Sequence, residues 1–324
     1  MRFKTDENLP TEVAALLIHH GHDALRVDQQ GLAGVADADA SRAGQIAIKY
    51  GCPVLSLSEI LSAAQAAVVA TPTTAHEEVA APLLEAGLDV LIEKPITPSV
   101  AAAERLLALA AANGRMLQVG HLERFNPAVT ALERIVTLPL FFEVHRMSTF
   151  SPRSLDVDVV LDLMIHDIEI VLALVKQKPS EIRAAGISIL SEKSDIANVR
   201  LAFPSGCVAN LTASRMSTEK VRKVRLFQPG EYISVDYTKQ ELMAVCISPE
   251  RQISFRPTAI VKGEPLKLEL EHFIDCIRTR RPPRVSGVEA TEALRVATDI
   301  LDRIEEHTGV VRETIGNWKG IPSV

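Results

Sequence analysis

Asp162 and His166 stand four residues apart in the segment DVVLDLMIHDIEIVL (158–172). Residues at i and i+4 share one face of a helix, so a carboxylate there can hold the imidazole in place. An imidazole oriented by a carboxylate is a natural general base near neutral pH. The alternative is a core residue, because a lone histidine on an apolar helix is more often buried and satisfied. The neighbouring Asp167 and the partner Asp162 weaken the preference for a core residue but do not reverse it.

A second candidate is Lys94, in the tripeptide EKP (93–95) that follows an apolar run. Residues just beyond the carboxyl ends of parallel strands line the ligand crevice of such sheets. A lysine there can bond an oxygen on a reacting carbon, although most lysines are surface residues whose stems cover apolar side chains. The segment ATPTTAH (70–76) also follows an apolar run. The cofactor-binding candidates in these two segments are Thr71, Pro72, Thr73, His76, Glu93 and Lys94.

Asp37 ends the apolar segment LAGVAD (32–37). In a dinucleotide-binding fold, an acid at the end of the second strand accepts hydrogen bonds from the adenosine ribose hydroxyls and favours NAD over NADP. Alternatively, Asp37 caps the helix expected to begin near Ser41. Both interpretations remain open from the sequence.

The elements that must position these residues follow two patterns. Apolar runs at 32–37, 53–58, 66–72, 89–95 and 116–121 alternate with helical stretches at 41–51, 76–87 and 99–114. This alternation predicts an α/β fold with a doubly wound, Rossmann-like parallel sheet. A helix at 156–175 then precedes a run of strands joined by tight turns, and helices at 266–280 and 287–307 end the chain. We therefore expect an α+β domain with a mostly antiparallel sheet at 121–324, after a dinucleotide-binding domain at 1–120.

The segment GHLERFNP (120–127) joins the two expected domains and gathers polar side chains. It is either a solvated crossover loop or part of a substrate site. His121, Arg124 and Asn126 are its substrate-binding candidates. Three arginines elsewhere are further candidates for an anionic substrate group, although an arginine is more often a surface charge: Arg146, Arg153 and Arg215.

Composition narrows the class of protein. The net charge of the 324 residues is −6 and the pI is near 5.9, which argues against nucleic-acid binding. The four cysteines form no CxxC pair, so we expect neither a metal site nor a disulfide framework. The first residues are charged and no apolar run approaches the ~20 residues of a membrane span. We expect a cytoplasmic protein with no membrane partner.

Together these motifs resemble the Gfo/Idh/MocA oxidoreductases over roughly residues 33–315. The resemblance implies a nicotinamide cofactor, a sugar or sugar-derivative substrate, and catalytic roles for Lys94, Asp162 and His166. GHLERFNP, HRMSTFSPRSLDVDVVLDLMIHD and ANLTASRMS are together similar to a narrower branch, the UDP-N-acetylglucosamine 3-dehydrogenases. We expect NAD as cofactor and a homo-oligomer, a dimer or tetramer, through the open face of the second sheet.

Residues 1–32 depart from that family. A glycine-rich turn that cradles a pyrophosphate is expected near the start, but the sequence reads DENLP (6–10). This start resembles a PIN-like, toxin-type nuclease domain. Asp6 and Glu7 would repel a pyrophosphate, and Pro10 offers no N–H. The alternative is an ordinary polar turn in which Asn8 or Thr11 caps a helix. The sequence thus leaves two functions open: an NAD-dependent oxidoreductase, and a non-catalytic family member that binds cofactor poorly.

Overall fold

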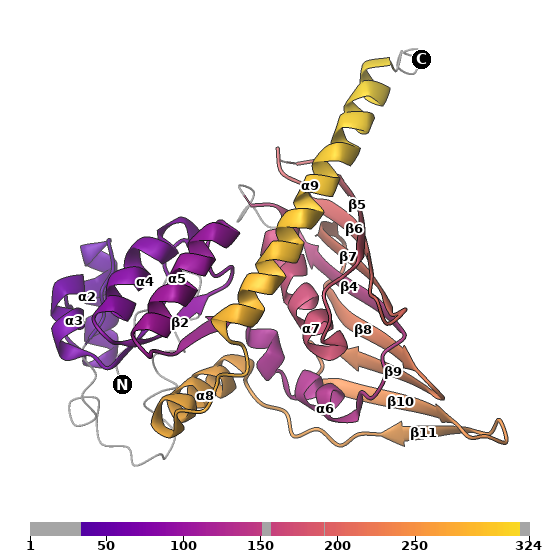
Figure 1. The fold of residues 1–324 in the computed structure, drawn as a ribbon, viewed down its shortest axis with the longest axis horizontal. Helices are drawn as coiled ribbons and strands as arrows, with labels where there is room; N and C mark the ends of the chain where they lie inside the picture. Colours follow the sequence, from indigo (N-terminus) through magenta and orange to yellow (C-terminus); the bar gives the residue numbers. More distant parts are fainter. Residues whose placement is uncertain (1–33, 151–156, 191, 318–324) are drawn as a thin grey trace. The chain divides into compact units, whose positions relative to one another are not determined.

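The computed structural model describes residues 34–150, 157–190 and 192–317. The chain forms two compact units, one of Met1–Phe125 with Gly263–Glu292 and one of Asn126–Lys262 with Ala293–Val324 (Figure 1). The first unit thus contains a later segment, 263–292, which a linear division of the sequence does not anticipate.

The first unit is built on a parallel sheet with strand order β1-β2-β3. An isolated parallel bridge joins Val35 to Val54, and an antiparallel bridge joins Gln118 to Ser286. The strands are β1 (Ala66–Val69), β2 (Asp89–Glu93) and β3 (Leu117–Gly120). The helices and short turns are α2 (Ala40–Tyr50), α3 (Leu57–Ala63), η1 (Thr73–Ala75), α4 (His76–Glu85), α5 (Val100–Ala112), η2 (Leu122–Phe125) and α8 (Pro265–Thr279).

Helices cover this parallel sheet, which explains why its strands are apolar throughout. Every residue of β1 is buried, as are the first four of β2. Leu270 and Phe273 of α8 pack on Ala66, Val68 and Leu91 of the sheet. The continuous apolar runs therefore predicted the parallel sheet correctly.

The second unit is built on an eight-stranded sheet with strand order β11-β10-β9-β8-β4-β7-β6-β5. Neighbouring strands are antiparallel except for β4 and β7, which run parallel. The strands are β4 (Phe141–Thr149), β5 (Glu181–Ile187), β6 (Ile196–Ala202), β7 (Val208–Ser217), β8 (Val221–Gln228), β9 (Glu231–Asp236), β10 (Glu241–Ile247) and β11 (Ile253–Pro257). The expected α/β class, with a mostly antiparallel second sheet, is confirmed.

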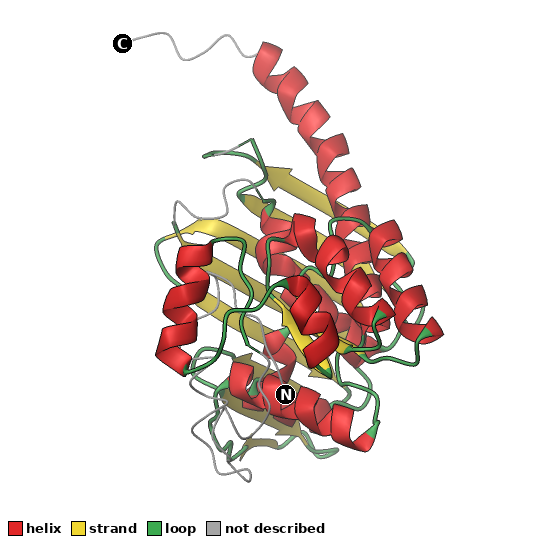
Figure 2. Cartoon of the chain, turned by 90° about the vertical axis from the view of Figure 1, so that its left-hand side faces the viewer, coloured by secondary structure: helices red, strands yellow, loops and turns green. Residues whose placement is uncertain are grey.

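Helices lie on one face of this second sheet, and its core lies between them (Figure 1). The helices are α6 (Pro127–Ile135), α7 (Ile165–Val175) and the part of α9 (Gly287–Asn317) from Ala293 onward. A π-helical turn, η3 (Val160–Met164), precedes α7. Helix α9 is the long helix that leads toward the C-terminus in Figure 2. Burial alternates along the strands, so the other face of the sheet carries exposed side chains.

Some elements differ from the prediction. Residues 53–58 were expected to be a short strand or loop, but α3 begins at Leu57 because Ser56 and Glu59 form a capping box. The segment 32–37 contributes only the bridge at Val35 among its described residues. Helix α6 and strands β4 and β11 were not predicted. No helix among the described residues is long and apolar enough to cross a membrane.

Candidate functional site

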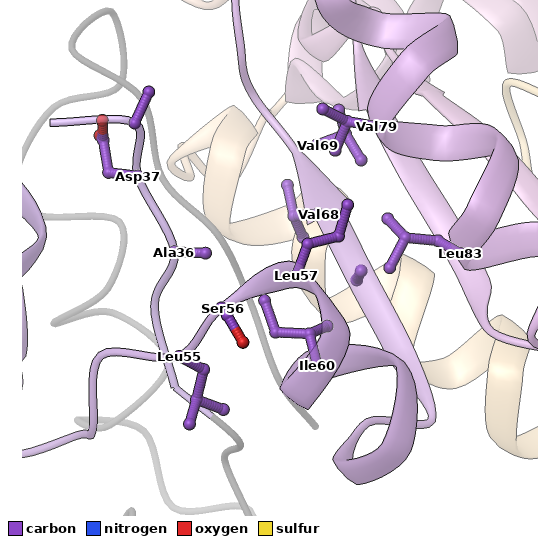
Figure 3. Close-up of a pocket in the computed structure, with 12 residues that line it drawn as sticks. Ala36, Asp37, Leu55, Ser56, Leu57, Ile60, Val68, Val69, Val79 and Leu83 are labelled. Carbon is purple, nitrogen blue, oxygen red and sulfur yellow. The ribbon is translucent and has the colours of Figure 1, made fainter. Parts of the chain in front are cut away.

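A pocket of about 260 Å³ lies in the first unit, between the segments 36–38 and 55–60 on one side and β1 with α4 on the other (Figure 3). Its walls are mostly aliphatic, and Asp37 and Ser56 add polar groups. The volume suits one part of a ligand better than a whole dinucleotide. The lining residues are Ala36, Asp37, Ala38, Leu55, Ser56, Leu57, Ile60, Ala67, Val68, Val69, Val79 and Leu83.

Asp37 is held in this pocket by its neighbours in the sequence. One of its carboxylate oxygens accepts the Asp39 N–H at 2.8 Å, and Arg42 lies 3.8 Å from the other. The helix α2 is capped by Asp39, which accepts the N–H groups of Ser41 and Arg42. The idea that Asp37 caps this helix is therefore wrong, and Asp37 lines the pocket instead.

The segment after β1 brings its polar groups to the same edge of the sheet as the pocket. Thr71 and Thr73 are half-buried, and Pro72 is exposed. The Thr71 hydroxyl is buried and has no hydrogen-bond partner among the described residues. The ring of His76 is fully buried and contacts the carbonyl oxygens of Thr71, Pro95 and Ile96. None of these residues lines the pocket, and His76 contacts backbone of its own chain; their contacts with a cofactor stay a prediction.

The EKP segment follows β2, next to the segment after β1. Glu93 and Lys94 are half-buried, and the Lys94 N–H lies 3.3 Å from a Glu93 carboxylate oxygen. The Glu93 carboxylate lies so close to Gly120 of β3 that a Cβ there would come within 2.9 Å of it. Glycine at position 120 thus makes room for the Glu93 side chain.

The segment after β3 is not a solvated loop. His121, Glu123 and Arg124 are all at least nine-tenths buried in and beside η2. Burial, together with the nearby cations Lys94 and Arg124, lowers the pKa of His121 to about 3. His121 is therefore neutral at physiological pH, and the positive charge of the nearby Lys94 contributes to this effect.

In the second unit, Asp162 and His166 lie on one continuous helical segment. Asp162 is in the π-helical turn η3, where the Ile165 N–H bonds back to the Val160 carbonyl, five residues earlier. His166 is the second residue of α7 and is 7% exposed. The predicted spacing thus falls across a widened turn, and such π turns are frequent at functional sites.

Asp167, the neighbour of His166, forms a buried ion pair. Its two carboxylate oxygens accept Nε and Nη2 of Arg146 at 2.6 and 2.9 Å, and both side chains are almost fully buried. The Arg146 guanidinium also lies over the Tyr237 ring. Arg146 is therefore not a surface charge; it anchors α7 to the sheet. No local signal in the sequence pairs residues 146 and 167.

The remaining predicted substrate-binding residues have structural partners or lie outside the described residues. Asn126 caps α6 through the Ala128 N–H and donates to the Tyr237 carbonyl. Arg215 is buried, donates to the Val157 carbonyl and lies 3.7 Å from Asp195. Arg153 and the turn DENLP lie outside the described residues. Substrate contacts by these side chains remain predictions.

Sequence analysis missed one buried acid, Glu269. It lies on the sheet-facing side of α8 with no exposed surface, and neither carboxylate oxygen has a hydrogen-bond partner among the described residues. Burial, with Glu93 nearby, raises the pKa of Glu269 well above its usual value. The neighbouring Gln118 donates to the Glu269 backbone carbonyl at 3.5 Å. Among the described residues, no three histidine, cysteine or acidic side chains come together to hold a metal ion.

Comparison with known proteins agrees with this arrangement. A family model described as "Oxidoreductase family, NAD-binding Rossmann fold" matches residues 12–121, and a "GFO/IDH/MocA C-terminal domain" matches residues 139–230. The chain is 34% identical over 281 residues to a UDP-N-acetylglucosamine 3-dehydrogenase of Acidithiobacillus ferrooxidans, covering 85% of this chain and 90% of that protein. It is 24% identical over 290 residues to a scyllo-inositol 2-dehydrogenase (NAD(+)) of Bacillus subtilis, covering 81% and 83%.

A solved structure of UDP-N-acetylglucosamine 3-dehydrogenase from Acidithiobacillus ferrooxidans superposes with a TM-score of 0.87 at 31% identity, covering 94% of this chain and 97% of that one. The fold and pocket define an α/β oxidoreductase with a dinucleotide-binding unit. This chain belongs to the Gfo/Idh/MocA family of oxidoreductases.

The described residues fit the adenosine end of NAD. The pocket offers aliphatic walls for a flat base and an acid, Asp37, for ribose hydroxyls. The buried Thr71 hydroxyl, which lacks a partner among the described residues, is available to a cofactor at the next strand end. When bound, NAD would supply the hydride acceptor.

Proposed function

We propose that this chain oxidises a ring hydroxyl of a sugar nucleotide, with UDP-N-acetylglucosamine as the first candidate substrate and NAD as cofactor. The observation that carries the proposal is the pocket that Asp37 lines. The same chain also has Lys94 directly after β2, and Asp162 and His166 on one helical segment. The 34% identity to UDP-N-acetylglucosamine 3-dehydrogenase supports the substrate class.

Each of the three residues has a role in this proposal. His166 accepts the proton of the substrate hydroxyl, and Asp162 orients its ring. The Lys94 ammonium stabilises the alkoxide that forms as the hydride leaves the same carbon. NAD is preferred over NADP because a 2′-phosphate would meet the negative charge of Asp37.

Turnover with purified protein tests the proposal directly. We expect NADH formation with UDP-N-acetylglucosamine and little with scyllo-inositol. His166→Ala and Lys94→Ala should each lower kcat by about 10²–10⁴, the usual effect of removing a positioned catalytic group. His145→Ala is the matched control, because His145 is a half-buried histidine on β4 of the same unit. Near-normal activity in His166→Ala would remove that residue from the mechanism.

A second candidate function, a family member that binds cofactor poorly, is favoured by one specific observation. The family match begins at residue 12, so it leaves out the DENLP turn. A glycine-rich turn would give several hydrogen bonds to charged phosphate oxygens, each worth about 1.5–3 kcal/mol. Replacing residues 1–32 by a strand, glycine-rich turn and helix should therefore tighten NAD binding about a hundredfold or more. Equal affinity of the two proteins by calorimetry would exclude this second candidate.

We also infer that the chain forms a homodimer through the open face of the second sheet. Phe141, Phe227 and Tyr232 form an aromatic row there, with ring centroids 5.9 and 5.0 Å apart. Charges of both signs lie beside this row, in the Arg225–Glu143 and Lys223–Asp236 pairs. A surface with mixed charges can complement a second copy of itself about a two-fold axis. Light scattering should give twice the chain mass, and Phe227→Asp should give a monomer; a wild-type monomer would refute the inference.

A further inference from the structure

His76 joins two segments that follow neighbouring strands of the parallel sheet. Its Nε2 lies 2.8 Å from the carbonyl oxygen of Thr71, which follows β1. Its Nδ1 lies 3.0 and 3.1 Å from the carbonyl oxygens of Pro95 and Ile96, which follow β2. The ring has no exposed surface. Its contacts thus span the edge of the sheet where the cofactor crevice lies.

The protonation of this ring follows from what surrounds it. A carbonyl oxygen can only accept a hydrogen bond, so a ring nitrogen must carry a proton to bond one. A neutral imidazole has a single N–H, and its second nitrogen would then point a lone pair at a carbonyl oxygen. The contacts on both sides of the His76 ring are satisfied together only when both nitrogens are protonated. That state is an imidazolium.

We propose that His76 is a positioning residue: a buried imidazolium that hydrogen-bonds both the segment after β1 and the segment after β2. We call these hydrogen bonds the strap, and they fix the position of Lys94. Lys94 directly precedes Pro95, whose carbonyl oxygen is one of the three that the ring contacts. This proposal rests on the proposed function only for the catalytic role of Lys94. The strap itself can be tested without the proposed function.

Burial and the nearby Lys94 disfavour a cation at this position, and the three carbonyl oxygens and the acids on the surrounding elements favour one. A helix N-terminus disfavours a cation, but α4 carries Glu77 and Glu78 in its first turn, which offset that effect. Glu77 is itself paired with Arg105 of α5. Among the described residues, the charged groups on the packed elements are Glu77, Glu78 and Glu85 of α4, Glu104 and Arg105 of α5, Asp89 and Glu93 of β2, and Lys94 after β2.

The sense of the pH dependence follows from the geometry. When the pH rises and the ring loses one proton, one side of the strap changes from a hydrogen bond to a repulsive contact. The two segments should then separate more easily. This effect is opposite in sign to that of the general base His166, which gains activity as it loses its proton.

The first experiment measures the ring itself and needs no substrate. In the full chain labelled with ¹⁵N-histidine, the His76 ring nitrogens are assigned by their loss in His76→Gln. We expect both to carry a proton at pH 7. A neutral His76 ring, with one protonated nitrogen, would overturn the proposal even if His76→Gln failed to fold well, because the signal of interest is that of the wild type.

The second experiment measures whether the strap holds its two segments. Amide hydrogen exchange in segments 71–76 and 94–97 should accelerate about tenfold or more in His76→Gln, as for the loss of one charge-assisted hydrogen bond. In the wild type, exchange corrected for its intrinsic pH dependence should show a step as the ring deprotonates, and the variant should lack this step. His307→Gln is the matched control, because that ring contacts one carbonyl, of Gly186, in the second unit. Unchanged exchange in His76→Gln would overturn the proposal.

The two experiments also separate this proposal from the proposed function. A protonated ring and a faster-exchanging variant, in a protein that oxidises no sugar nucleotide, would support the strap and refute the function. In an active enzyme, His76→Gln should lower kcat more than it raises KM and should lose the alkaline decline in rate that strap deprotonation causes. An unchanged alkaline limb in the variant would overturn the positioning role.

Discussion

The two units of this chain treat buried charge in opposite ways. In the second unit, the buried cations are held by acids: Arg146 binds Asp167 through two hydrogen bonds, and Arg215 lies beside Asp195. In the first unit, burial instead favours the neutral forms of His121 and Glu269, and the cation proposed at His76 meets backbone carbonyl oxygens rather than a carboxylate in the contacts described above. An ion pair is lost only when acid protonates its carboxylate, whereas unfolding lets His121 take up a proton below about pH 6.5 and lets Glu269 release one above pH 4.5. The first unit is therefore expected to be the more pH-sensitive one near neutral pH.

The largest expected effect is the loss of the buried pair in the second unit. Asp167→Asn keeps the side-chain shape but leaves the Arg146 guanidinium without its anion. Breaking a buried ion pair from one side costs about 3–5 kcal/mol, because the remaining charge stays buried. Denaturant unfolding should show this loss at neutral pH. A loss below about 1 kcal/mol, the range of exposed pairs, would mean that solvent reaches Arg146.

A smaller effect is expected from His121 on the acid side. Its folded-state pKa of about 3 lies below the usual 6.5, so the unfolded chain binds the proton more readily. The stabilisation of the neutral ring is thus complete above about pH 6.5 and is lost as the pH falls toward 3. Between pH 6.5 and 5 the loss should reach about 2 kcal/mol, at about 1.4 kcal/mol per pH unit. His121→Phe, which cannot bind a proton, should remove this part of the acid slope, and an unchanged slope would contradict the assignment.

Glu269 should act in the opposite direction. Its pKa is raised in the folded state, so the folded chain keeps a proton that the unfolded chain gives up above pH 4.5. Stability should therefore fall as the pH rises above that value, with a slope of at most about 1.4 kcal/mol per pH unit. Glu269→Gln mimics the protonated acid and should flatten this part of the curve. A variant with the wild-type slope would show that Glu269 is ionised in the folded protein.

The sequence was sufficient for the features that local patterns encode. Continuous apolar runs predicted β1, β2 and β3. The acid that ends the apolar segment 32–37, Asp37, was singled out from the sequence, and it lines the pocket. One local signal was overlooked: Ser56 and Glu59 have the spacing of a capping box and mark the start of α3. Helix α6 was also missed, although Asn126 and Pro127 form an ordinary helix start.

Other features depend on contacts between distant residues, and no local pattern contains them. The return of α8 to the first unit rests on Leu270 and Phe273 packing against β1 and β2. The pairing of Arg146 with Asp167 depends on α7 lying over β4. Glu269 looks like an ordinary helix-surface acid in the sequence, and only its packing against the sheet shows that it is buried. His76 was predicted to bind the cofactor, and the carbonyl oxygens around it appear only in the folded chain.

The smallest expected effect is at an exposed ion pair of the second unit, and it sharpens the comparison between buried and surface charge. Arg225 and Glu143 lie across from each other on β8 and β4, 3.1 Å apart, with side chains 44% and 40% exposed. Water screens such a pair, and ordering two long side chains costs entropy, so the coupling should be below about 1 kcal/mol. A double-mutant cycle with Arg225→Ala and Glu143→Gln isolates this coupling from the loss of side-chain packing. The same cycle with Arg146→Met and Asp167→Asn should give a coupling several times larger, since both charges there are removed from water. Equal couplings in the two cycles would mean that burial does not set the strength of ion pairs in this sheet.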